Sequence, residues 1–319
     1  MKPPYNITGE ILKLVASISE KLGEVNALHL HKPRTQLRKK NRIKTIQSSL
    51  EIEGNTLSEE QITALLNNKR VIAPQKDILE VQNAIKVYEQ LHTFNPNRIK
   101  DLEKAHGVLM QGLIEDAGKF RSKSVGVVKG SKVEHFAPSG NRVRGFINDL
   151  LDYLKNDKDL LLIKSCVFHY ELEFIHPFMD GNGRMGRFWQ TLILVQQYPV
   201  FEFLPVESLI KENQKEYYNV LSQSDKLGHS TLFIEFMLNI IFQSLGNLLK
   251  TQNRTLTTKD RIELFKDKIE TQEFSRKDYL QSFKNISQAT ASRDLKWGVE
   301  QGILEKNGDK RLTVYKYSK

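Results

Sequence analysis

The stretch that decides the fold and chemistry of this 319-residue chain is His176-Pro177-Phe178-Met179-Asp180-Gly181-Asn182-Gly183-Arg184-Met185-Gly186-Arg187. These residues bring together an imidazole, a carboxylate, a Gly-Asn-Gly turn and two guanidiniums. An imidazole can remove a proton from a nucleophile, and amides with guanidiniums can hold a polyphosphate. The stretch therefore predicts an anion-binding loop with a general base beside it.

The flanking sequence places this loop between two helices. Apolar residues dominate 160–174 and 188–194, which predicts one helix before the loop and another after it. Pro177 disfavours helical geometry at His176, so the first helix should end there. Gly181 lets the backbone turn tightly, and the second helix should open near Asn182 with its positive dipole end at the loop.

The same residues resemble the signature of the Fic family, His-Pro-Phe-x-Asp-Gly-Asn-Gly-Arg-x-x-Arg, at every defining position. The resemblance implies an adenylyltransferase that moves AMP from ATP to a Ser, Thr or Tyr hydroxyl of a target protein and of itself. It implies that His176 deprotonates the hydroxyl and that Asp180 holds Mg²⁺, whose shell substrate phosphates complete. A plain helix-capping loop with surface arginines would leave the joint spacing of these groups unexplained.

The nucleotide site implied by the resemblance covers the second half of the motif. The amides around Gly181 to Gly183 would cradle the α-phosphate, and Arg184 and Arg187 would take the outer phosphates. A related branch that phosphorylates differs at the second glycine of the loop, so the intact Gly183 favours AMP transfer. The full set is Asp180, Gly181, Asn182, Gly183, Arg184, Met185, Gly186 and Arg187.

A second segment, Ser49-Leu50-Glu51-Ile52-Glu53-Gly54, predicts regulation. Apolar residues at helical spacing predict an amphipathic helix over about 42–53 that Gly54 ends, with Ser49 and Glu53 on one face. An exposed carboxylate before a capping glycine is the plain interpretation. The segment resembles the inhibitory helix of many Fic proteins, which implies that Glu53 pairs with Arg187 and takes the donors that the γ-phosphate needs.

A β-hairpin is predicted between these two segments. Residues 125–128 and 133–138 alternate in the way short strands do, with 129–132 as the tip. The hairpin resembles the Fic flap, which implies docking of a target segment by strand addition. A hairpin without a partner remains the alternative. The expected docking residues are Val127, Val133, His135 and Phe136.

Tyr217 is the expected adenine contact. Residues 216–221 resemble the family helix that closes over the base, and Tyr217 would stack on or hydrogen-bond it. A tyrosine in the core is the alternative. Some relatives have an asparagine further along, where this chain has Asp225, so that adenine contact is open.

Composition is typical of a cytoplasmic enzyme. The single cysteine, Cys166, excludes a disulfide within the chain and is expected to be a core thiol. No apolar run approaches the ~18 residues that cross a bilayer, and the first residues lack a signal-peptide pattern, so no membrane partner is expected. The net charge of +10 fits nucleic acid, an acidic partner or plain solubility.

The fold class that follows is mainly α, a Fic-type helical core with a hairpin flap and a small C-terminal winged helix-turn-helix. Residues 1–250 should form the Fic domain, with the inhibitory helix at about 42–54 and the catalytic core at about 100–242. Helical periodicity predicts its other helices over 5–28, 79–91, 99–113, 141–154, 207–222 and 230–249.

Residues 255–319 should form the small domain, after a polar linker at 250–255. Three predicted helices start near Arg261, Ser275 and Ser287, and strands at 303–304 and 312–317 should close a hairpin. Residues 287–293 resemble the start of a recognition helix, with 14 Lys and Arg against 10 Asp and Glu from Lys259 onward. DNA binding stands beside dimerisation and target docking. The alternative function is therefore a DNA-binding regulator whose Fic core senses nucleotide or modifies only itself.

Overall fold

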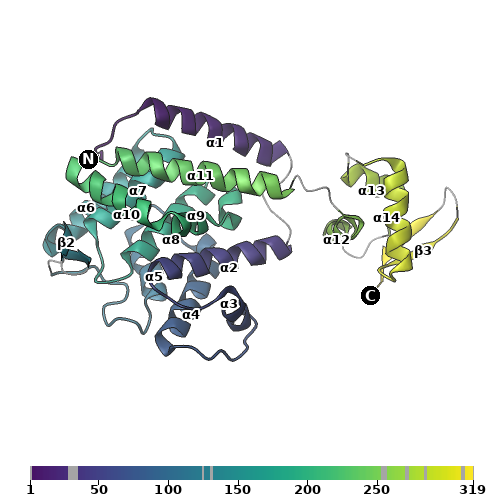
Figure 1. Cartoon of the computed structure of the whole chain (residues 1–319), viewed down its shortest axis with the longest axis horizontal. Coiled ribbons are helices and arrows are strands. Elements are labelled where there is room, and N and C mark those ends of the chain that lie inside the picture. Colours follow the sequence, from purple (N-terminus) through teal and green to yellow (C-terminus); the bar gives the residue numbers. More distant parts are fainter. Residues whose placement is uncertain are drawn as a thin grey trace. The chain divides into compact units, whose positions relative to one another are not determined.

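A computed structural model describes residues 2–27, 35–123, 126–129, 132–252, 257–269, 273–283, 286–309 and 313–318. The chain divides into two compact units, Met1–Leu249 and Lys250–Lys319. The first unit is helical apart from one hairpin, so the mainly α class with one hairpin is confirmed (Figure 1). Its elements are α1 (Gly9–Ala27), α2 (Thr35–Ile52), α3 (Glu59–Leu66), α4 (Gln75–Glu89), η1 (Leu91–Thr93), α5 (Ile99–Leu109), β1 (Gly126–Lys129), β2 (Lys132–Phe136), η2 (Gly140–Arg142), α6 (Val143–Asn156), α7 (Leu161–Ile175), α8 (Asn182–Val195), η3 (Pro199–Phe203), α9 (Val206–Glu212), α10 (Gln214–Leu227) and α11 (Thr231–Gln252).

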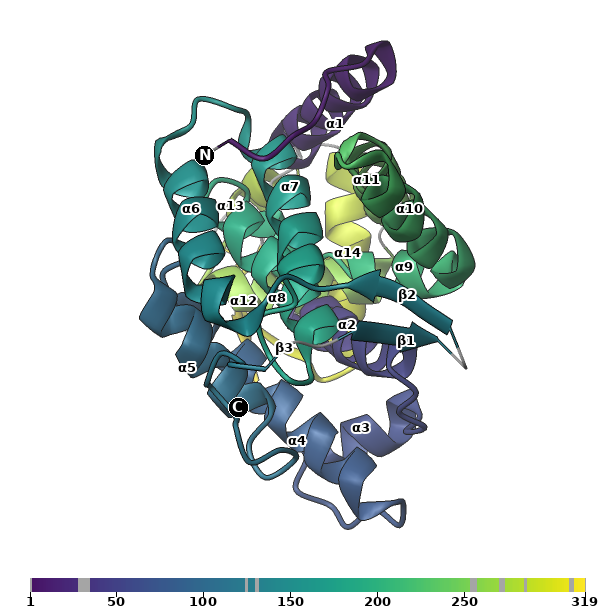
Figure 2. The same ribbon diagram turned by 90° about the vertical axis from the view of Figure 1, so that its left-hand side faces the viewer.

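Helices α7 and α8 form the centre of this unit, with α6 on one side and α10 and α11 on the other (Figure 2). Both central helices are buried over most of their surface, which suits α7 because it is apolar nearly all round, whereas α8 also buries Arg184 and Arg187. Trp189 and Phe168 are fully buried and their rings stack at 6.5 Å. The loop between α7 and α8 is thereby held on a rigid base.

Helix α2 lies along α9 and reaches α8 (Figure 1). Its apolar face buries Ile46 and Leu50, as the periodicity predicts. The helix begins at Thr35, earlier than the expected start near 42. It ends before Gly54, whose φ of +92° is a conformation that glycine adopts without strain.

The single helix expected over 207–222 is wrong, because two helices, α9 and α10, meet at Asn213. The side chain of Asn213 donates to the Leu209 carbonyl at 2.8 Å, and its backbone has φ −109° and ψ 28°. An asparagine that bonds to the backbone in this way competes with the helical ladder. The break separates the helix under α2 from the helix that carries Tyr217.

Helix α11 is long and apolar enough to cross a membrane by length and composition, with a mean hydropathy of 1.5 over Thr231–Lys250. Uninterrupted apolar runs, on which the sequence expectation rested, do not reveal it, since polar residues such as Asn239 and Ser244 occur within it. In the structure 56% of that stretch is buried. Its burial, with Phe233, Ile241 and Leu245 in the core, is that of a core helix.

The hairpin pairs β1 with β2 antiparallel, from Gly126 opposite Phe136 to Lys129 opposite Lys132. The register is irregular between Val127 and Val128. The expected tip residues 130–131 lie outside the described residues. The side chains of Val127, Val133, His135 and Phe136 also lie outside what the structure describes, so their docking role stays a prediction.

The second unit contains α12 (Thr258–Ile269), α13 (Arg276–Ser282), α14 (Gln288–Glu300), β3 (Leu304–Asn307) and β4 (Val314–Tyr317). Ser275 and Ser287 cap α13 and α14, as their positions predict. Strand β3 begins and ends later than expected, and residues 310–312 between the strands are not described. The order of three helices followed by two strands is the order that the sequence predicts for this unit.

A buried ion pair fixes the core of this unit. Asp294 is fully buried and accepts from Arg261 Nε at 2.6 Å and Nη2 at 2.7 Å. Tyr279 and Thr258 donate to the same carboxylate. The pair is bidentate and its remaining lone pairs are satisfied, which a buried charge requires.

Candidate functional site

The loop between α7 and α8 is closed by the side chain of Asn182. The Asn182 amide accepts from the Phe178 N–H at 2.9 Å and donates to the Phe178 carbonyl at 3.0 Å. His176 has φ +49° and Gly181 φ +83°, so both ends of the loop are left-handed. For His176, which is not glycine, this conformation is strained and must be held by its surroundings.

His106 on α5 packs against the loop and bonds to its backbone. Its ring stacks on Phe178 with centroids 3.6 Å apart and planes 3° apart. Its Nδ1 accepts from the Gly118 N–H at 2.9 Å, so the proton of the neutral ring is on Nε2, which lies 2.9 Å from the Asp180 carbonyl. Burial lowers the pKa of His106 to about 4, which keeps it in this neutral form.

Asp180 presents its side chain to solvent, with 56% of it exposed. Its Oδ1 accepts from the Gly181 N–H at 2.6 Å and lies 3.3 Å from Arg184 Nη2. Within the described ranges no group of three His, Cys, Asp or Glu side chains could hold a metal. One exposed carboxylate nevertheless fits Mg²⁺ that arrives with a nucleotide, because this ion keeps several waters and takes its other ligands from phosphates.

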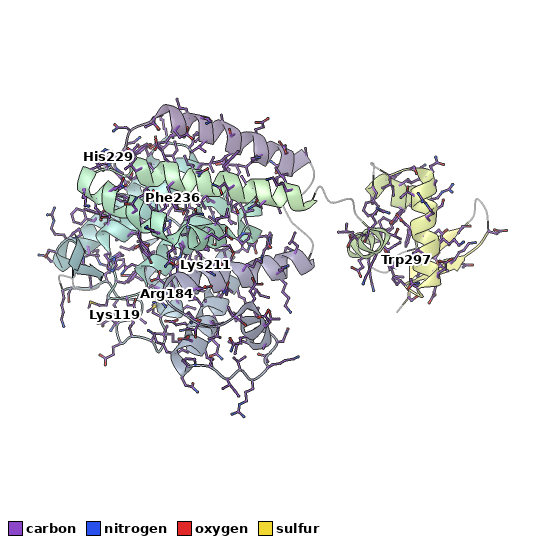
Figure 3. The ribbon with its side chains drawn as sticks, viewed as in Figure 1. Lys119, Arg184, Lys211, His229, Phe236 and Trp297 are labelled. Atoms are coloured by element: carbon purple, nitrogen blue, oxygen red, sulfur yellow. The ribbon has the colours of Figure 1, made fainter. Side chains whose placement is uncertain are left out.

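Arg184 is tied to a carboxylate from α4 (Figure 3 labels Arg184). Its Nη1 donates to Glu80 Oε1 at 3.2 Å, and both side chains are buried. Glu80 Oε2 also accepts from Asn55 Nδ2 at 2.8 Å, and Asn55 follows Gly54 directly. Glu80 thus links the first motif arginine to the segment after α2.

Arg187 is tied to α2 by three bonds. Its Nε donates to Ser49 Oγ at 3.0 Å, and its Nη2 donates to the Ser49 carbonyl at 2.9 Å and to Glu53 Oε1 at 2.7 Å. Burial opposes the charge of Arg187, but Glu53 raises its pKa well above the usual range. Its Nη1 is buried and has no hydrogen-bond partner among the described residues. The contact expected between Glu53 and Arg187 is present.

Two glycines of α8 face a second carboxylate from α7. A Cβ on Gly183 would lie 3.4 Å from Glu173 Oε1, and a Cβ on Gly186 would lie at the same distance from it. The latter Cβ would also lie 2.6 Å from His169 Cδ2. Burial raises the pKa of Glu173 to about 7, in competition with the charge of Arg187. Glu173 is therefore a titratable neighbour of Arg187.

Tyr217 is a core residue in this structure, with 1% of its surface exposed. Its hydroxyl lies 3.0 Å from His169 Nε2 and 3.3 Å from Glu173 Oε1. Its ring packs on Phe233 and Phe236. The core alternative describes it better than an adenine contact. Asp225 accepts from the Tyr170 hydroxyl at 2.9 Å.

The motif therefore gathers the groups that a phosphate ester needs. The first N–H groups of α8 have no carbonyl partner within the helix and carry its positive dipole end. Arg184 and Arg187 add two guanidiniums on the same helix, and His176 lies just before Pro177 at the other end of the loop. Both guanidiniums are engaged by carboxylates, Glu80 and Glu53, from other helices.

Sequence reasoning missed four residues around this loop. Each is a polar side chain that the fold buries or half-buries. Glu80 and His106 occupy apolar helix faces, beside Val81 and Ala105, which is the only signal that could have drawn notice. The four are Glu80, His106, Arg121 and Glu173.

Comparisons with known proteins agree with this site. The Fic/DOC family model matches residues 96–194, which contain the loop and both helices. A solved Fic family protein from Desulfovibrio desulfuricans G20 is 38% identical, covers 100% of this chain and 98% of its own, and superposes with a TM-score of 0.78. The chain therefore belongs to the Fic family.

More distant relatives are named as adenylyltransferases. The protein adenylyltransferase fic-1 of Caenorhabditis elegans is 28% identical over 78% of this chain and 51% of its own length. The protein adenylyltransferase Fic of Nematostella vectensis is 29% identical over 60% of this chain and 45% of its own. The chain spans about half the length of these curated relatives. Residues 134–508 of Caenorhabditis elegans Fic-1, 21% identical to this chain with a TM-score of 0.62, share its fold.

Proposed function

We propose that this protein transfers AMP from ATP to the hydroxyl of a Ser, Thr or Tyr, on a target protein and on itself. The observation that carries the proposal is the set of donors on the first turns of α8. The N–H groups of its first turn and the guanidiniums of Arg184 and Arg187 lie at the end of the loop that His176 begins. The relatives named protein adenylyltransferase support the same reaction.

In this reaction His176 accepts the proton of the target hydroxyl. The hydroxyl oxygen forms a bond to the α-phosphorus, the bond from that phosphorus to the bridging oxygen of the β-phosphate breaks, and pyrophosphate leaves. The N–H groups at the start of α8 would stabilise charge on the α-phosphate oxygens. Arg184 and Arg187 would hold the outer phosphates through charge-assisted bonds.

Asp180 would hold Mg²⁺, because its exposed carboxylate is a hard oxygen ligand at the edge of the loop. When bound, the ion would neutralise phosphate charge and orient the phosphate chain. Arg184 lies 3.3 Å from the same carboxylate, so it would reach the phosphates from the ion's side of the loop.

Glu53 would inhibit this AMP transfer. Its carboxylate takes Nη2 of Arg187 at 2.7 Å, a donor that a γ-phosphate would otherwise use. The carboxylate also places a negative charge where phosphate charge would lie. Ser49 occupies Nε of the same guanidinium at 3.0 Å, so α2 covers the arginine as a unit.

The β1–β2 hairpin would dock the target. Each strand has one paired edge, and an extended segment of a target can add to an outer edge through backbone hydrogen bonds. Docking of this kind reads mainly backbone, so it fits several target sequences.

The test compares ATP labelled on the α-phosphate with ATP labelled on the γ-phosphate, using a Glu53→Gly variant of the full chain. We expect the α-label to enter protein and the γ-label to stay out. Adding His176→Ala should lower incorporation by about 10²–10⁴-fold, while a nucleotide analogue still binds, because the imidazole acts on the hydroxyl. Incorporation of the γ-label instead would replace AMP transfer with phosphorylation.

DNA binding by the second unit is a second candidate. Helix α14 exposes Gln288, Ala289 and Arg293 near its start, and Arg276 and Lys277 are exposed where α13 begins. Arg276 donates to Ser292 Oγ at 3.0 Å, so the two helices share one basic surface. Short polar side chains with flanking cations suit a helix that enters a major groove.

A further inference from the structure

Arg121 uses its whole guanidinium to hold backbone carbonyls. Its side chain is buried, with 3% of the residue exposed. Its Nε donates to the His176 carbonyl at 2.6 Å, and its Nη2 donates to the Ile175 carbonyl at 3.0 Å. The side-chain hydrogen bonds of Arg121 to the described residues all end on backbone carbonyls, and burial lowers the pKa of its guanidinium. A buried cation without a counter-ion is costly, so its bonds to carbonyls must compensate.

These bonds fix the end of α7. The last carbonyls of a helix have no partner within it, and a cation placed there also matches the helix dipole. Arg121 supplies the donors for two successive carbonyls, those of Ile175 and His176. Its backbone N–H adds a third, to the Pro177 carbonyl at 2.9 Å. The left-handed backbone of His176 is thus held from one side chain.

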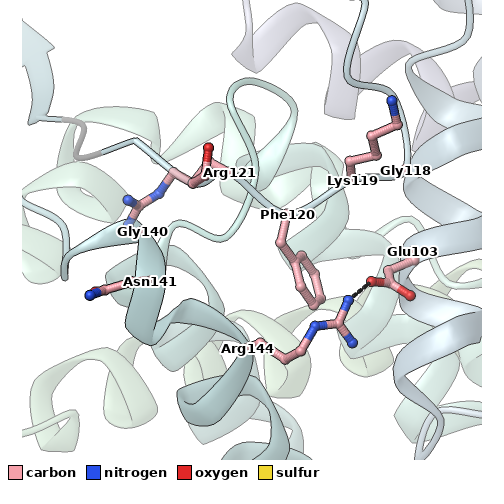
Figure 4. Close-up of a pocket in the computed structure, with 9 residues that line it drawn as sticks. Glu103, Gly118, Lys119, Phe120, Arg121, Gly140, Asn141 and Arg144 are labelled. Carbon is pink, nitrogen blue, oxygen red and sulfur yellow. Dashed lines mark hydrogen bonds and ion pairs between the residues drawn. The ribbon is translucent and has the colours of Figure 1, made fainter.

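The same guanidinium holds both ends of the hairpin. Its Nη1 donates to the Lys123 carbonyl at 2.7 Å, shortly before β1, and its Nη2 donates to the Pro138 carbonyl at 2.6 Å, shortly after β2. Gly140 closes this base, since a Cβ there would lie 2.2 Å from the Ser122 carbonyl carbon. Figure 4 shows the guanidinium of Arg121 pointing toward Gly140 and away from Arg144.

We propose that Arg121 is a positioning residue that sets the distance between His176 and a target segment docked on the β1–β2 hairpin. The inference rests on the proposed AMP transfer. A general base must lie within about 2.6–3.2 Å of the hydroxyl it deprotonates. A misplacement of about 1 Å costs on the order of 10²-fold in rate. One side chain bonded both to the base's backbone and to the hairpin's base can enforce that distance.

The geometry demands arginine at this position. The fork of a guanidinium reaches four carbonyls in different directions, whereas a lysine offers three donors from a single nitrogen. Arg121→Lys keeps the charge, but its ammonium cannot span the carbonyls of His176 and Pro138 together with that of Lys123. The variant therefore loosens the link between base and hairpin while leaving a cation at the end of α7.

Arg144→Lys is the matched control. Arg121, Gly140 and Arg144 all line one pocket of about 430 Å³ (Figure 4). Its side chain is 60% exposed and pairs with Glu103 at 2.5 Å, over the ring of Phe120. It contacts neither the His176 loop nor the carbonyls of Lys123 and Pro138 in any described bond. The same chemical change there should leave the transfer geometry intact.

The experiment adds each change to the Glu53→Gly chain and measures two rates with ATP and Mg²⁺. One rate is AMP incorporation into the chain itself, and the other is release of free AMP by transfer to water. We expect Arg121→Lys to lower the ratio of incorporation to release about ten- to a hundredfold, with affinity for a non-hydrolysable ATP analogue unchanged. Arg144→Lys should leave the ratio unchanged.

The ratio does not depend on the fraction of folded protein, so a purely structural role would not move it. Gly140→Ala provides a second variant, because its Cβ must push the Ser122 segment away while every nitrogen of Arg121 is retained. It should lower the same ratio. If Arg121→Lys and Gly140→Ala both leave the ratio unchanged, the positioning role is wrong while AMP transfer stands. If Glu53→Gly alone incorporates no AMP, the transfer proposal itself falls, and this inference falls with it.

Discussion

The carboxylate of Glu53 fills the space beside Gly183. A Cβ on Gly183 would lie 2.5 Å from Glu53 Oε1 and 3.2 Å from Arg187 Nη1. Gly183 is the second residue of α8 and adopts no left-handed φ, so the surrounding space requires a glycine here and the backbone does not. The Glu53 carboxylate, Gly183 and Arg187 thus share one small volume, which the proposed nucleotide phosphate would also need.

Glu53→Gly should release the protein from the proposed inhibition and raise its AMP transfer. The change frees the Nη2 proton of Arg187 that Glu53 holds, while the bond from Nη2 to the Ser49 carbonyl stays, and it removes the negative charge beside Gly183. A charge-assisted bond of this kind contributes roughly 1.5–3 kcal/mol, so productive ATP occupancy should rise about ten- to a hundredfold. Labelling of the chain by AMP, followed with α-labelled ATP, measures the gain. Adding Arg187→Ala should abolish it, because the freed donor is then missing.

Glu51→Gly is the control for that comparison. Glu51 lies two residues earlier at the same helix end and pairs with Lys211 at 2.6 Å, not with Arg187 (Figure 3 labels Lys211). The Glu51→Gly substitution introduces the same residue and removes the same charge as Glu53→Gly. Equal labelling by wild type, Glu51→Gly and Glu53→Gly would show that the end of α2 is ordinary scaffolding.

Gly183→Ala tests whether phosphate and Glu53 compete for one volume. In the Glu53→Gly chain that carboxylate is gone, so a methyl at 183 meets Nη1 of Arg187 at 3.2 Å, Glu173 Oε1 at an ordinary contact distance of 3.4 Å, and the space proposed for phosphate. We expect the double variant to bind an ATP analogue, and to label itself, at least about tenfold less than Glu53→Gly. Gly145→Ala, whose Cβ meets nothing within 4 Å, should change neither quantity. Undiminished binding by the double variant would place the phosphates elsewhere.

Local chemistry made the loop predictable from the sequence. Pro177 and Gly181 fix where one helix must stop and the next begin, and α7 ends at Ile175 while α8 begins at Asn182. The contact between Glu53 and Arg187 crosses 134 residues. No periodicity indicates such a contact, and only the pairing of two family motifs predicted it.

The supports of the loop could not be predicted in this way. Glu80, His106 and Arg121 lie on segments whose own patterns are ordinary, and their roles arise from contacts with residues 55 to 104 positions away. Tyr217 shows the converse. Its spacing fits a helix face toward a ligand, but Phe233 and Phe236 of α11 cover it, which only the packed structure reveals.

Glu173 should make stability depend on pH. Its folded pKa of about 7 lies above the ordinary value of 4.5, because burial disfavours its charged form. The hydrogen bonds around Glu173 agree with a protonated carboxyl group. Gln190 donates its amide to Cys166, so its oxygen accepts from His169 Nδ1. The other ring nitrogen, Nε2, therefore accepts the hydrogen bond of the Tyr217 hydroxyl. The Tyr217 oxygen is then left to accept a hydrogen bond from a protonated Glu173.

Between pH 4.5 and about 7 the folded protein therefore holds a proton at Glu173 that the unfolded chain releases. Stability contributed by that proton is present below this window and is lost as pH rises through it. Glu173→Gln should flatten the fall of the unfolding free energy with pH in this window by up to about 1.4 kcal/mol per pH unit. Urea unfolding at pH 5 and pH 7.5 measures the slope. The exposed Glu212→Gln is the control, and identical slopes for wild type and Glu173→Gln would show that Glu173 is ionised throughout.

The basic surface of α13 and α14 leads us to predict a salt-sensitive complex with duplex DNA. The full chain should shift a duplex of the promoter upstream of its own gene, with affinity falling steeply as salt rises, because phosphate contacts release counterions. Arg293 is exposed on α14, and Arg293→Ala should cost roughly 1–3 kcal/mol if it reads a base, or about five- to a hundredfold in affinity. Lys266→Ala is the control, because Lys266 is a cation on α12, outside α13 and α14, and lies over the ring of Tyr317. AMP labelling by Glu53→Gly should be unchanged by either substitution. A full chain that binds neither this duplex nor unrelated DNA at low salt would leave the basic surface of α13 and α14 to a protein partner.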